Sequence, residues 1–366
     1  MSDHVQSARI GRIGHIRLDR PQALNSLTLP MVRRFAQALD AFGKDDDTLG
    51  VVVTGAGERA FCAGGDIRGL HDASAAAEHP YKAFWREEYR LDARIATFPK
   101  PYVVVMDGLV MGGGVGISAH GNRRLVTRRT RLAMPEVGIG YIPDVGGTWL
   151  LGRGGGAGFY MALSGCTVGP ADALHLALAD LCIDECRIPE LLADFEHCLS
   201  PQDIDDALAG VATDPGEAVL TAQRMLLDDA MAGESIEDIL AALKGARTEF
   251  SRRAVIAIAR NSPTSLRLTL ELLKRARESQ RLEECLLREY AAACALLASH
   301  DLREGVRAAI IDKDRSPRWS PATLAEVDDA TIAGMLDAPV VDGPSFAPWD
   351  QPKFATPWRS AERERG

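Results

Sequence analysis

What the sequence lacks excludes several classes of protein. No run approaches the roughly 18–20 apolar residues that a membrane-spanning helix needs, and the N-terminus shows no apolar segment like that of a signal peptide. An excess of positive charge is also absent, because 42 Lys and Arg oppose 51 Asp and Glu and leave a net charge of −9. We therefore expect a cytoplasmic protein with neither a membrane nor a nucleic acid as its partner. An anionic ligand could still bind a local basic patch or backbone N–H groups.

Cysteine and histidine are too scattered to form a metal site or a disulfide framework. The seven Cys are an odd number, and Cys182 and Cys186 are spaced too widely for a CxxC site. The eight His do not gather into a set of ligands. We expect reduced thiols, mostly buried, and neither a metal nor a redox cofactor.

The chain has a globular composition and alternates strand and helix patterns over residues 1–190. Its 366 residues, 46% of them hydrophobic and 25% charged, allow one large domain or two smaller ones. Thr28 can cap a helix whose apolar residues recur every three or four positions from Val32 to Phe42. Apolar, β-branched runs predict strands within residues 9–18, 49–57, 98–108 and 123–134, the last holding one strand or two. This alternation predicts an α/β fold.

The pattern changes after about residue 200. Helical periodicity with many charge pairs four residues apart follows, and Ser262 before Pro263 marks a helix start. The last thirty or so residues are rich in Pro and Trp and lack periodicity, which predicts an irregular tail over the surface. We therefore expect an α/β core over residues 1–200, a C-terminal helical region over residues 201–330 and an irregular tail over residues 331–366.

Two of the three glycine-rich segments carry no ligand-binding motif. Residues 55–60 fit the dinucleotide pattern GxGxxA, but two further glycines stand where a helix should continue. Residues 152–158 lack the Lys-Ser/Thr ending of a phosphate loop and predict a loop or a helix start. Within residues 116–120, Ser118 only approaches the GxSxG nucleophile pattern, because His120 replaces the last glycine.

The remaining glycine segment, residues 108–121, follows a strand and contains three consecutive glycines. Glycine lets the backbone approach a ligand closely, and the first N–H groups of a helix beginning there would have no partner within the helix. Such groups can stabilise a developing negative charge. The alternative is a tight strand-to-helix turn in which glycine serves packing alone.

Glu136 and Asp144 are the only charged residues in MPEVGIGYIPDVGG, residues 134–147. Apolar residues and glycines surround them, so both carboxyls are expected to be buried. Two carboxyls in an apolar pocket titrate as a coupled pair, with at least one pKa raised. The alternative is structural: Asp144 would cap a turn, and Glu136 would cap a helix or pair with an Arg.

Four motifs together resemble the crotonase, or enoyl-CoA hydratase/isomerase, superfamily. They are, in chain order, RPQALNSLT, AFCAGGDI, MGGGVGISAHG and AMPEVGIGYIPDVGG. A second set resembles one branch of that superfamily, the 3-hydroxyisobutyryl-CoA hydrolases, and extends the likeness to about residue 327. This set comprises FWREEY, SAHG, IPDVGG and HDLREGVRAAIIDKDRSPRWSPATL.

The resemblance implies a crotonase-like spiral of ββα units with a C-terminal helical region, and an acyl-CoA substrate. It implies that the N–H groups of Gly65 and Gly113 hold the thioester oxygen. Hydratases of the superfamily use two glutamates. One corresponds to Glu136, whereas the other would stand at Gly116 and is missing. The hydratases have glycine where this chain has Asp144, so the second carboxyl has moved. We therefore expect attack on a carbonyl rather than hydration of an alkene.

The resemblance also implies substrate contacts, with Glu88 accepting a hydrogen bond from a substrate hydroxyl beside Gly113, Glu136 and Asp144. Ala63, Asp66 and Ile67 would line the channel for the CoA moiety. The alternatives are a solvated helix face for Glu88 and plain loop packing for the other three.

The expected activity is hydrolysis of a short 3-hydroxyacyl-CoA, with 3-hydroxyisobutyryl-CoA of valine catabolism favoured. CoA is then part of the substrate, and no cofactor is expected. The alternatives are an enoyl-CoA hydratase or isomerase and a non-catalytic acyl-CoA-binding protein. The sequence leaves the oligomeric state open, a homo-oligomer included.

Overall fold

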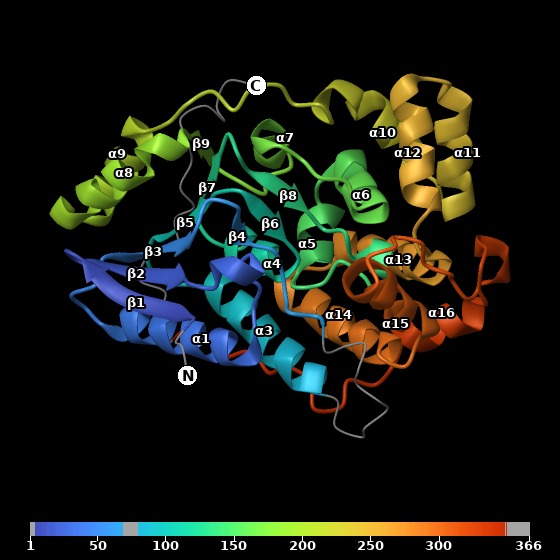
Figure 1. Ribbon diagram of the computed structural model, residues 1–366, viewed down its shortest axis with the longest axis horizontal. Helices are drawn as coiled ribbons and strands as arrows, with labels where there is room; N and C mark the ends of the chain where they lie inside the picture. Colours follow the sequence, from blue (N-terminus) through green and yellow to red (C-terminus); the bar gives the residue numbers. More distant parts are fainter. Residues whose placement is uncertain (1–3, 69–79, 348, 350–366) are drawn as a thin grey trace.

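Two parallel-stranded sheets form the centre of the N-terminal half (Figure 1). The protein is described from a computed structural model, which covers residues 4–68, 80–347 and 349. The larger sheet has the strand order β1-β2-β3-β5-β7-β9, and all neighbours except β1 and β2 are parallel. Its strands are β1 (Val5–Ile10), β2 (Ile13–Leu18), β3 (Gly50–Gly55), β5 (Tyr102–Met106), β7 (Arg123–Thr127) and β9 (Leu181–Ile183). The smaller sheet consists of β4 (Ala60–Cys62), β6 (Leu109–Met111) and β8 (Arg131–Ala133).

The strand predictions are confirmed with shorter bounds. β3 and β5 are buried along nearly their whole length, as expected of parallel strands covered on both faces. Residues 123–134 hold two strands, β7 and β8, which lie in different sheets. Residues 9–18 span parts of two strands, because Gly11, with φ of 54°, turns the chain between β1 and β2.

Helices cover both faces of the larger sheet. α1 (Leu29–Lys44) begins after Thr28, whose hydroxyl accepts a hydrogen bond from the N–H of Met31 as predicted. α1 packs beside α3 (Pro80–Ala96) on one face of the sheet (Figure 1). α8 (Ile188–Asp194) and α9 (Pro201–Gly210) contribute Leu191 and Ile204 to the apolar layer on the other face.

The C-terminal half is helical, as predicted, and packs on the N-terminal half. Ser262 caps α13 (Pro263–Glu278) by accepting a hydrogen bond from the N–H of Ser265. One apolar core includes residues from Val5 to Trp349, so it spans the predicted boundary at residue 200, which stays a prediction. The other helices are α4 (Gly113–Ala119), α5 (Gly147–Gly152), α6 (Gly155–Ser164), α7 (Pro170–His175), α10 (Arg224–Ala230), α11 (Ile236–Ala246), α12 (Glu249–Ala259), α14 (Leu282–Leu296), α15 (His300–Val306) and α16 (Asp329–Leu336).

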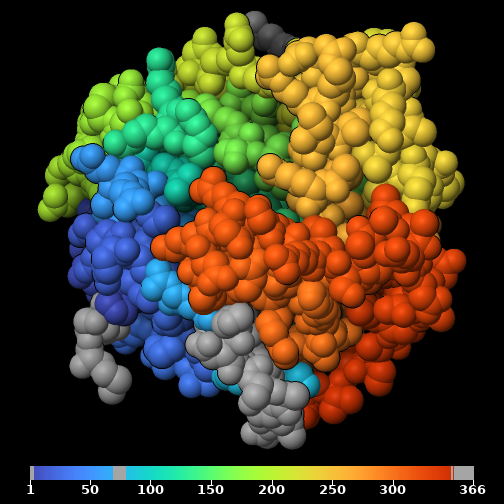
Figure 2. All heavy atoms as spheres, turned by 45° about the vertical axis from the view of Figure 1, so that its right-hand side comes forward, coloured from blue at the N-terminus to red at the C-terminus, as the bar shows by residue number. Residues whose placement is uncertain are grey.

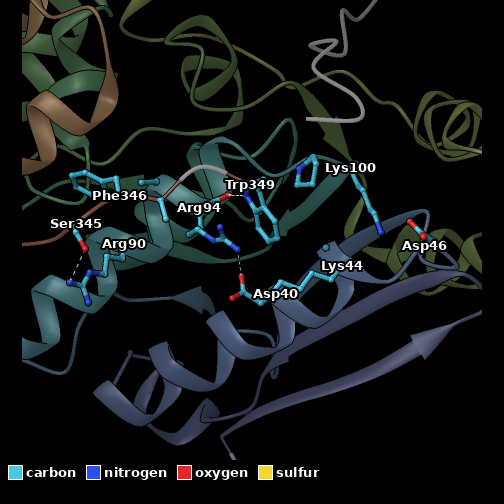
Figure 3. Close-up of a pocket in the computed structure, with 13 residues that line it drawn as sticks. Asp40, Lys44, Asp46, Arg90, Arg94, Lys100, Ser345, Phe346 and Trp349 are labelled. Carbon is cyan, nitrogen blue, oxygen red and sulfur yellow. Dashed lines mark hydrogen bonds and ion pairs between the residues drawn. The ribbon is translucent and has the colours of Figure 1, made fainter. Parts of the chain in front are cut away.

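The tail is not irregular throughout, because α16 begins at Asp329 and runs into the range predicted to lack structure. Farther along, Trp349 enters a pocket of about 730 Å³ beside α1 and α3 (Figure 3). Its indole N–H donates to the carbonyl of Arg94 over 3.1 Å, and the Arg94 guanidinium lies 3.5 Å from the ring centre. The tail is therefore anchored to the outer face of α3, while residues 350–366 lie outside the described residues.

Two further expectations can be compared with the structure. All seven Cys are unpaired and four of them are buried, which confirms the reduced thiols. Within the described residues, no helix combines the length and the apolarity that crossing a membrane requires.

We predict opposite effects of alanine at two helical glycines. A Cβ at Gly158 in α6 would lie 2.1 Å from the carbonyl oxygen of Leu151, whereas nothing lies within 4 Å of one at Gly245 in α11. Gly158→Ala should therefore lower the free energy of unfolding by about 1–3 kcal/mol through overpacking. Gly245→Ala should raise it by about 0.5 kcal/mol, because alanine favours the helix. Urea denaturation of both variants measures the difference, and equal effects would contradict the packing of α6 against α5.

Candidate active site

Folding brings the three predicted acids to one cavity of about 790 Å³. Glu88 projects inward from α3, Glu136 begins the short helix η2 (Glu136–Ile139), and Asp144 follows in the loop before α5. Their exposed fractions are only 1%, 8% and 5%, respectively. The alternative that Glu88 lies on a solvated helix face is therefore wrong. All three acids are buried in the cavity wall rather than placed at the surface.

Asp144 is held by two phenols rather than by a cation. Its Oδ2 accepts hydrogen bonds from the hydroxyls of Tyr89, at 2.7 Å, and Tyr141, at 3.1 Å. Burial raises the pKa of Asp144 to about 6, and the two phenols limit that rise because they stabilise the ionised form. Trp85 stacks on Tyr141 with a centroid distance of 5.4 Å and fixes the second phenol. Asp144 is therefore the acid most readily ionised near neutral pH.

Glu136 has the opposite environment. Its Oε2 is buried and has no hydrogen-bond partner among the described residues. Burial, and then the charge of Asp144, raise the pKa of Glu136 well above its usual value. Its Oε1 would lie 2.9 Å from a Cβ at Gly112, so the carboxyl is next to the three-glycine turn. The two acids therefore differ in acidity, and Glu136 is the weaker acid of the two.

Glu88 lies against the same turn from the other direction. A Cβ at Gly113 would lie 2.3 Å from its Oε1, so a larger residue at position 113 would displace the Glu88 carboxyl. Burial, followed by the charges of Asp144 and Glu136, raises the pKa of Glu88 well above its usual value. The Oε1 atom has no partner among the described residues, and the side chain lines the cavity. The carboxyl is therefore placed to meet a ligand bound beside Gly113.

The two predicted backbone donors lie on neighbouring loops in the cavity wall. Gly113 is the first residue of α4, so its N–H has no partner within the helix. Gly65 lies on the other loop, which pairs with Leu27. The N–H of Leu27 donates to the carbonyl of Gly64, and the N–H of Asp66 donates to the carbonyl of Leu27, so the N–H of Gly65 takes no part in this pairing. The loops touch, because a Cβ at Gly64 would lie 3.6 Å from the nitrogen of Gly113.

The three residues predicted to contact CoA do not share one environment. Ala63 and Ile67 line the cavity. Asp66 is not among the lining residues, because its carboxylate pairs with Arg20 at 2.8 Å and its carbonyl accepts a hydrogen bond from Tyr81. Contacts of CoA with any of the three stay a prediction.

Asp92 is a buried acid near the site that the sequence analysis missed. It lies one helical turn after Glu88 and is 0% exposed, and neither of its oxygens has a partner among the described residues. A Cβ at Gly116 would lie 2.8 Å from its Oδ1 and 2.7 Å from the Cβ of Val145. The spacing of four between Glu88 and Asp92 could have placed both acids on one helix face.

The C-terminal half closes the cavity, as the resemblance implied, but the sequence analysis named none of the residues that do so. Part of the wall comes from Arg260, Asn261, Gly305, Ala308, Arg315 and Trp319. In Figure 2 this part of the chain (orange, near residues 300–320) lies between the N-terminal half and the yellow helices. No local sequence signal marks such residues, because their contacts with the site span more than a hundred positions.

The geometry can be compared with known proteins. A family model described as enoyl-CoA hydratase/isomerase matches residues 13–336. The chain belongs to the enoyl-CoA hydratase/isomerase family. The superfamily resemblance and the crotonase-like fold predicted from the sequence are thereby confirmed.

Curated members of this family resemble the chain over most of its length. The protein named "3-hydroxyisobutyryl-CoA hydrolase, mitochondrial" of Gallus gallus is 39% identical over 330 residues, which cover 88% of this chain and 86% of that protein. The protein of the same name from Homo sapiens is 36% identical, with coverages of 91% and 89%.

Solved structures of the family carry different names. A structure described as a carnitinyl-CoA dehydratase from Mycobacterium thermoresistibile superposes with a TM-score of 0.88 at 44% identity, covering 94% of this chain and 99% of its own. One described as an enoyl-CoA hydratase from Rhodobacter sphaeroides has a TM-score of 0.84 at 40% identity, with coverages of 91% and 97%.

The comparison with the curated relatives corrects the expected subcellular location. The curated relatives are named as mitochondrial proteins, so the prediction of a cytoplasmic protein is wrong. That prediction rested on how the sequence begins, and the first residues do not determine the compartment.

We predict that Asp92→Asn flattens the pH dependence of stability. Burial, followed by the charges of Glu88, Asp144 and Glu289, raises the pKa of Asp92 well above its usual value of 3.8. The folded state then holds a proton that the unfolded chain releases above that value, so this group's contribution to stability is lost as the pH rises. Asparagine does not titrate. The urea midpoint of the variant should fall less between pH 5 and pH 9 than that of the wild type, and parallel curves would contradict the prediction.

Proposed function

We propose that the protein hydrolyses a short 3-hydroxyacyl-CoA thioester, with 3-hydroxyisobutyryl-CoA as the favoured substrate, and releases the free acid and CoA. The observation that carries this proposal is the pairing of Glu136 and Asp144, two buried acids of different acidity, beside the Gly65 and Gly113 amides in one cavity. The names of the curated relatives support the same reaction and substrate.

The oxygen of the thioester would be held by the two amides. During attack on the carbonyl carbon, a new C–O bond forms and the electron pair of the C=O bond moves onto this oxygen. Backbone donors already in position stabilise that charge, and losing one such donor typically costs about 3 kcal/mol. When the intermediate collapses, the C–S bond breaks and CoA leaves as a thiolate.

Glu136 and Asp144 would manage the proton. Glu136 is the protonated member of the pair and Asp144 the ionised one, so transfer from Glu136 to Asp144 creates a carboxylate beside the substrate. The Glu136 carboxylate then attacks directly, forming an anhydride that water hydrolyses, or takes a proton from an attacking water. The proton on Asp144 passes to the sulfur of the leaving CoA. Both routes need the same two acids and no cofactor.

Glu88 would provide selectivity for the hydroxyl group of the substrate. Its unpartnered Oε1 borders Gly113, so a substrate whose oxygen is bound there carries its 3-hydroxyl within reach of this wall. A buried polar group that is satisfied only by the substrate's hydroxyl disfavours analogues that lack it.

Hydration of an enoyl-CoA is the second candidate, because the two solved structures carry hydratase and dehydratase names. In the hydratases of this superfamily a second glutamate would stand at position 116. Here that position is glycine, and the side chains of Val145 and Asp92 already fill the space around it. Without a carboxyl at position 116, the site lacks one of the two acids that hydration uses, and thioester hydrolysis is favoured.

We predict that the protein releases free CoA from 3-hydroxyisobutyryl-CoA faster than from isobutyryl-CoA or acetyl-CoA, because only the first presents a hydroxyl to Glu88. A thiol-reactive dye measures CoA release, and loss of enoyl absorbance from crotonyl-CoA measures hydration in the same preparation. Hydration of crotonyl-CoA that exceeds every thiol release would favour the second candidate instead.

A pair of variants controls for the role of Glu88. Glu88→Leu should reduce the preference for 3-hydroxyisobutyryl-CoA over isobutyryl-CoA by about tenfold, the equivalent of one hydrogen bond. Glu88→Gln keeps a hydrogen-bonding group and should retain most of the preference. If both variants keep the wild-type ratio, Glu88 does not contact the hydroxyl.

We predict that Glu136→Gln and Asp144→Asn each lower kcat by about 10²–10⁴-fold, the range typical of a lost general acid or base. The wild-type kcat should fall as the pH is lowered through about 6, where Asp144 becomes protonated. Steady-state kinetics and far-UV circular dichroism together separate lost chemistry from lost folding. Near-normal turnover of a folded variant would remove that acid from the reaction.

A further inference from the structure

The turn that carries Asp144 is held in a conformation that its own sequence disfavours. Val145 has φ of 54°, in the left-handed region that β-branched residues rarely adopt. Such a conformation costs of the order of 1–3 kcal/mol and persists only where surrounding contacts impose it. The groups that impose it here determine where the Asp144 carboxylate points.

Glu289 of α14 supplies most of these contacts. Its Oε2 accepts a hydrogen bond from the N–H of Gly146 at 2.7 Å. Its Oε1 accepts two more from Thr148, from the N–H at 3.0 Å and from the hydroxyl at 2.5 Å. Glu289 is 0% exposed and lies more than 140 positions from the turn along the chain.

His120 completes the support from the other side. Its Nε2 lies 2.7 Å from the carbonyl oxygen of Val145. Burial lowers the pKa of His120 to about 4, so the ring is neutral at physiological pH and donates its Nε2–H to that oxygen. The peptide group that follows the strained residue is therefore fixed at both ends, its carbonyl by His120 and its N–H by Glu289.

We infer that Glu289 is a positioning residue, which holds the Asp144 carboxylate in its working orientation by fixing the strained turn at Val145. This inference rests on the proposed hydrolase function, since it deepens the role of Asp144 in that reaction. It gives the C-terminal helical region a part in the chemistry besides closing the cavity.

The three hydrogen bonds require Glu289 to accept on both oxygens. A proton on Oε2 would set its O–H against the N–H of Gly146, and a proton on Oε1 would require the Thr148 hydroxyl to reverse and accept, so only the ionised carboxylate accepts all three hydrogen bonds. Burial raises the pKa of Glu289 to about 7, while the bonds from Thr148 and Gly146 limit the rise. The turn is therefore expected to loosen as the pH falls through about 7, above the pH at which Asp144 itself is protonated.

Other titratable groups lie near Glu289 and influence its pKa. Asp144 on the turn, Asp92 and Tyr89 on α3, and Cys285 on its own helix interact with its charge. All of them are acids, so each negative charge that forms nearby disfavours the ionised state of Glu289. The acid limb of the kcat profile should therefore contain two steps, an upper one from Glu289 and a lower one from Asp144.

The test compares Glu289→Gln with Glu284→Gln. The second variant makes the same change on the same helix, at a side chain that accepts from the N–H of Gln280 and pairs with Arg281, away from the turn. Glu289→Gln should lower kcat by about 10²-fold with KM changed less than about threefold, because a small misplacement of a reacting group has that effect. It should also lose the upper step of the acid limb. Glu284→Gln should match the wild type in both respects.

Thr148→Val provides a second variant that leaves Glu289 in place. Removing the hydroxyl takes away a bond that stabilises the ionised carboxylate, so the upper step should move to higher pH, opposite to its loss in Glu289→Gln. Thr148→Ser keeps the hydroxyl and should restore the wild-type profile. If Glu289→Gln fails to fold, this pair alone decides the question.

Amide hydrogen exchange separates this inference from the proposed function. Exchange over residues 145–150, followed by mass spectrometry, should be faster in Glu289→Gln and unchanged in Glu284→Gln, whatever reaction the protein catalyses. Wild-type protein that releases no CoA would contradict the proposed function alone. Unchanged exchange together with an unchanged acid limb in Glu289→Gln would overturn the positioning role.

Discussion

The site depends on several carboxyl groups that are buried close together with no positively charged side chain paired to them among the described residues. Glu88, Glu136 and Asp144 line one cavity, with Asp92 and Glu289 packed behind it. An ionised carboxylate in an apolar environment is costly unless it is paired or hydrogen-bonded. None of these acids forms an ion pair with Arg or Lys among the described residues, so each must either keep its proton or find neutral donors.

The protein uses both solutions, and the division between them defines the site. Asp144 accepts from two phenols, and Glu289 accepts from two backbone N–H groups and a hydroxyl. These two are the acids whose pKa values stay nearest to neutral, at about 6 and about 7. Glu136 and Glu88 keep unpartnered oxygens, and burial raises their pKa values well above the usual value. A set of chemically similar side chains is thus separated into stronger and weaker acids by neutral donors alone.

Much of this arrangement could be predicted from the sequence, because part of it is local. The three-glycine turn at the start of α4 can be recognised within residues 108–121. The two isolated acids, Glu136 and Asp144, can be recognised within residues 134–147. The strands at β3 and β5 follow from their β-branched runs, and Thr28 and Ser262 mark helix starts. The tail was predicted to be irregular because Pro and Trp dominate its later part, but α16 begins with Asp328 as its cap and buries Ile332 and Leu336.

The missed residues share a physical reason. Tyr89, Asp92 and Glu289 stand on helices and act on the site through contacts with other segments of the chain, and the sequence does not show that their helix faces point inward. Glu289 lies among half-buried acids and bases of α14, and only the packing of α14 against α5 shows that its carboxylate is fully buried. Helical periodicity could have shown that Glu88 and Asp92 share a face, but not that the face looks inward.

Position 116 shows how one residue links the turn to the chemistry. A glutamate there would have to displace the side chain of Val145, and Val145 adopts its left-handed conformation directly above that glycine. The turn that presents Asp144 therefore occupies the space that a side chain at position 116 would need. A carboxyl at 116 and a carboxyl at 144 in this conformation exclude each other sterically. The glycine at position 116 and the turn that presents Asp144 are therefore linked by packing.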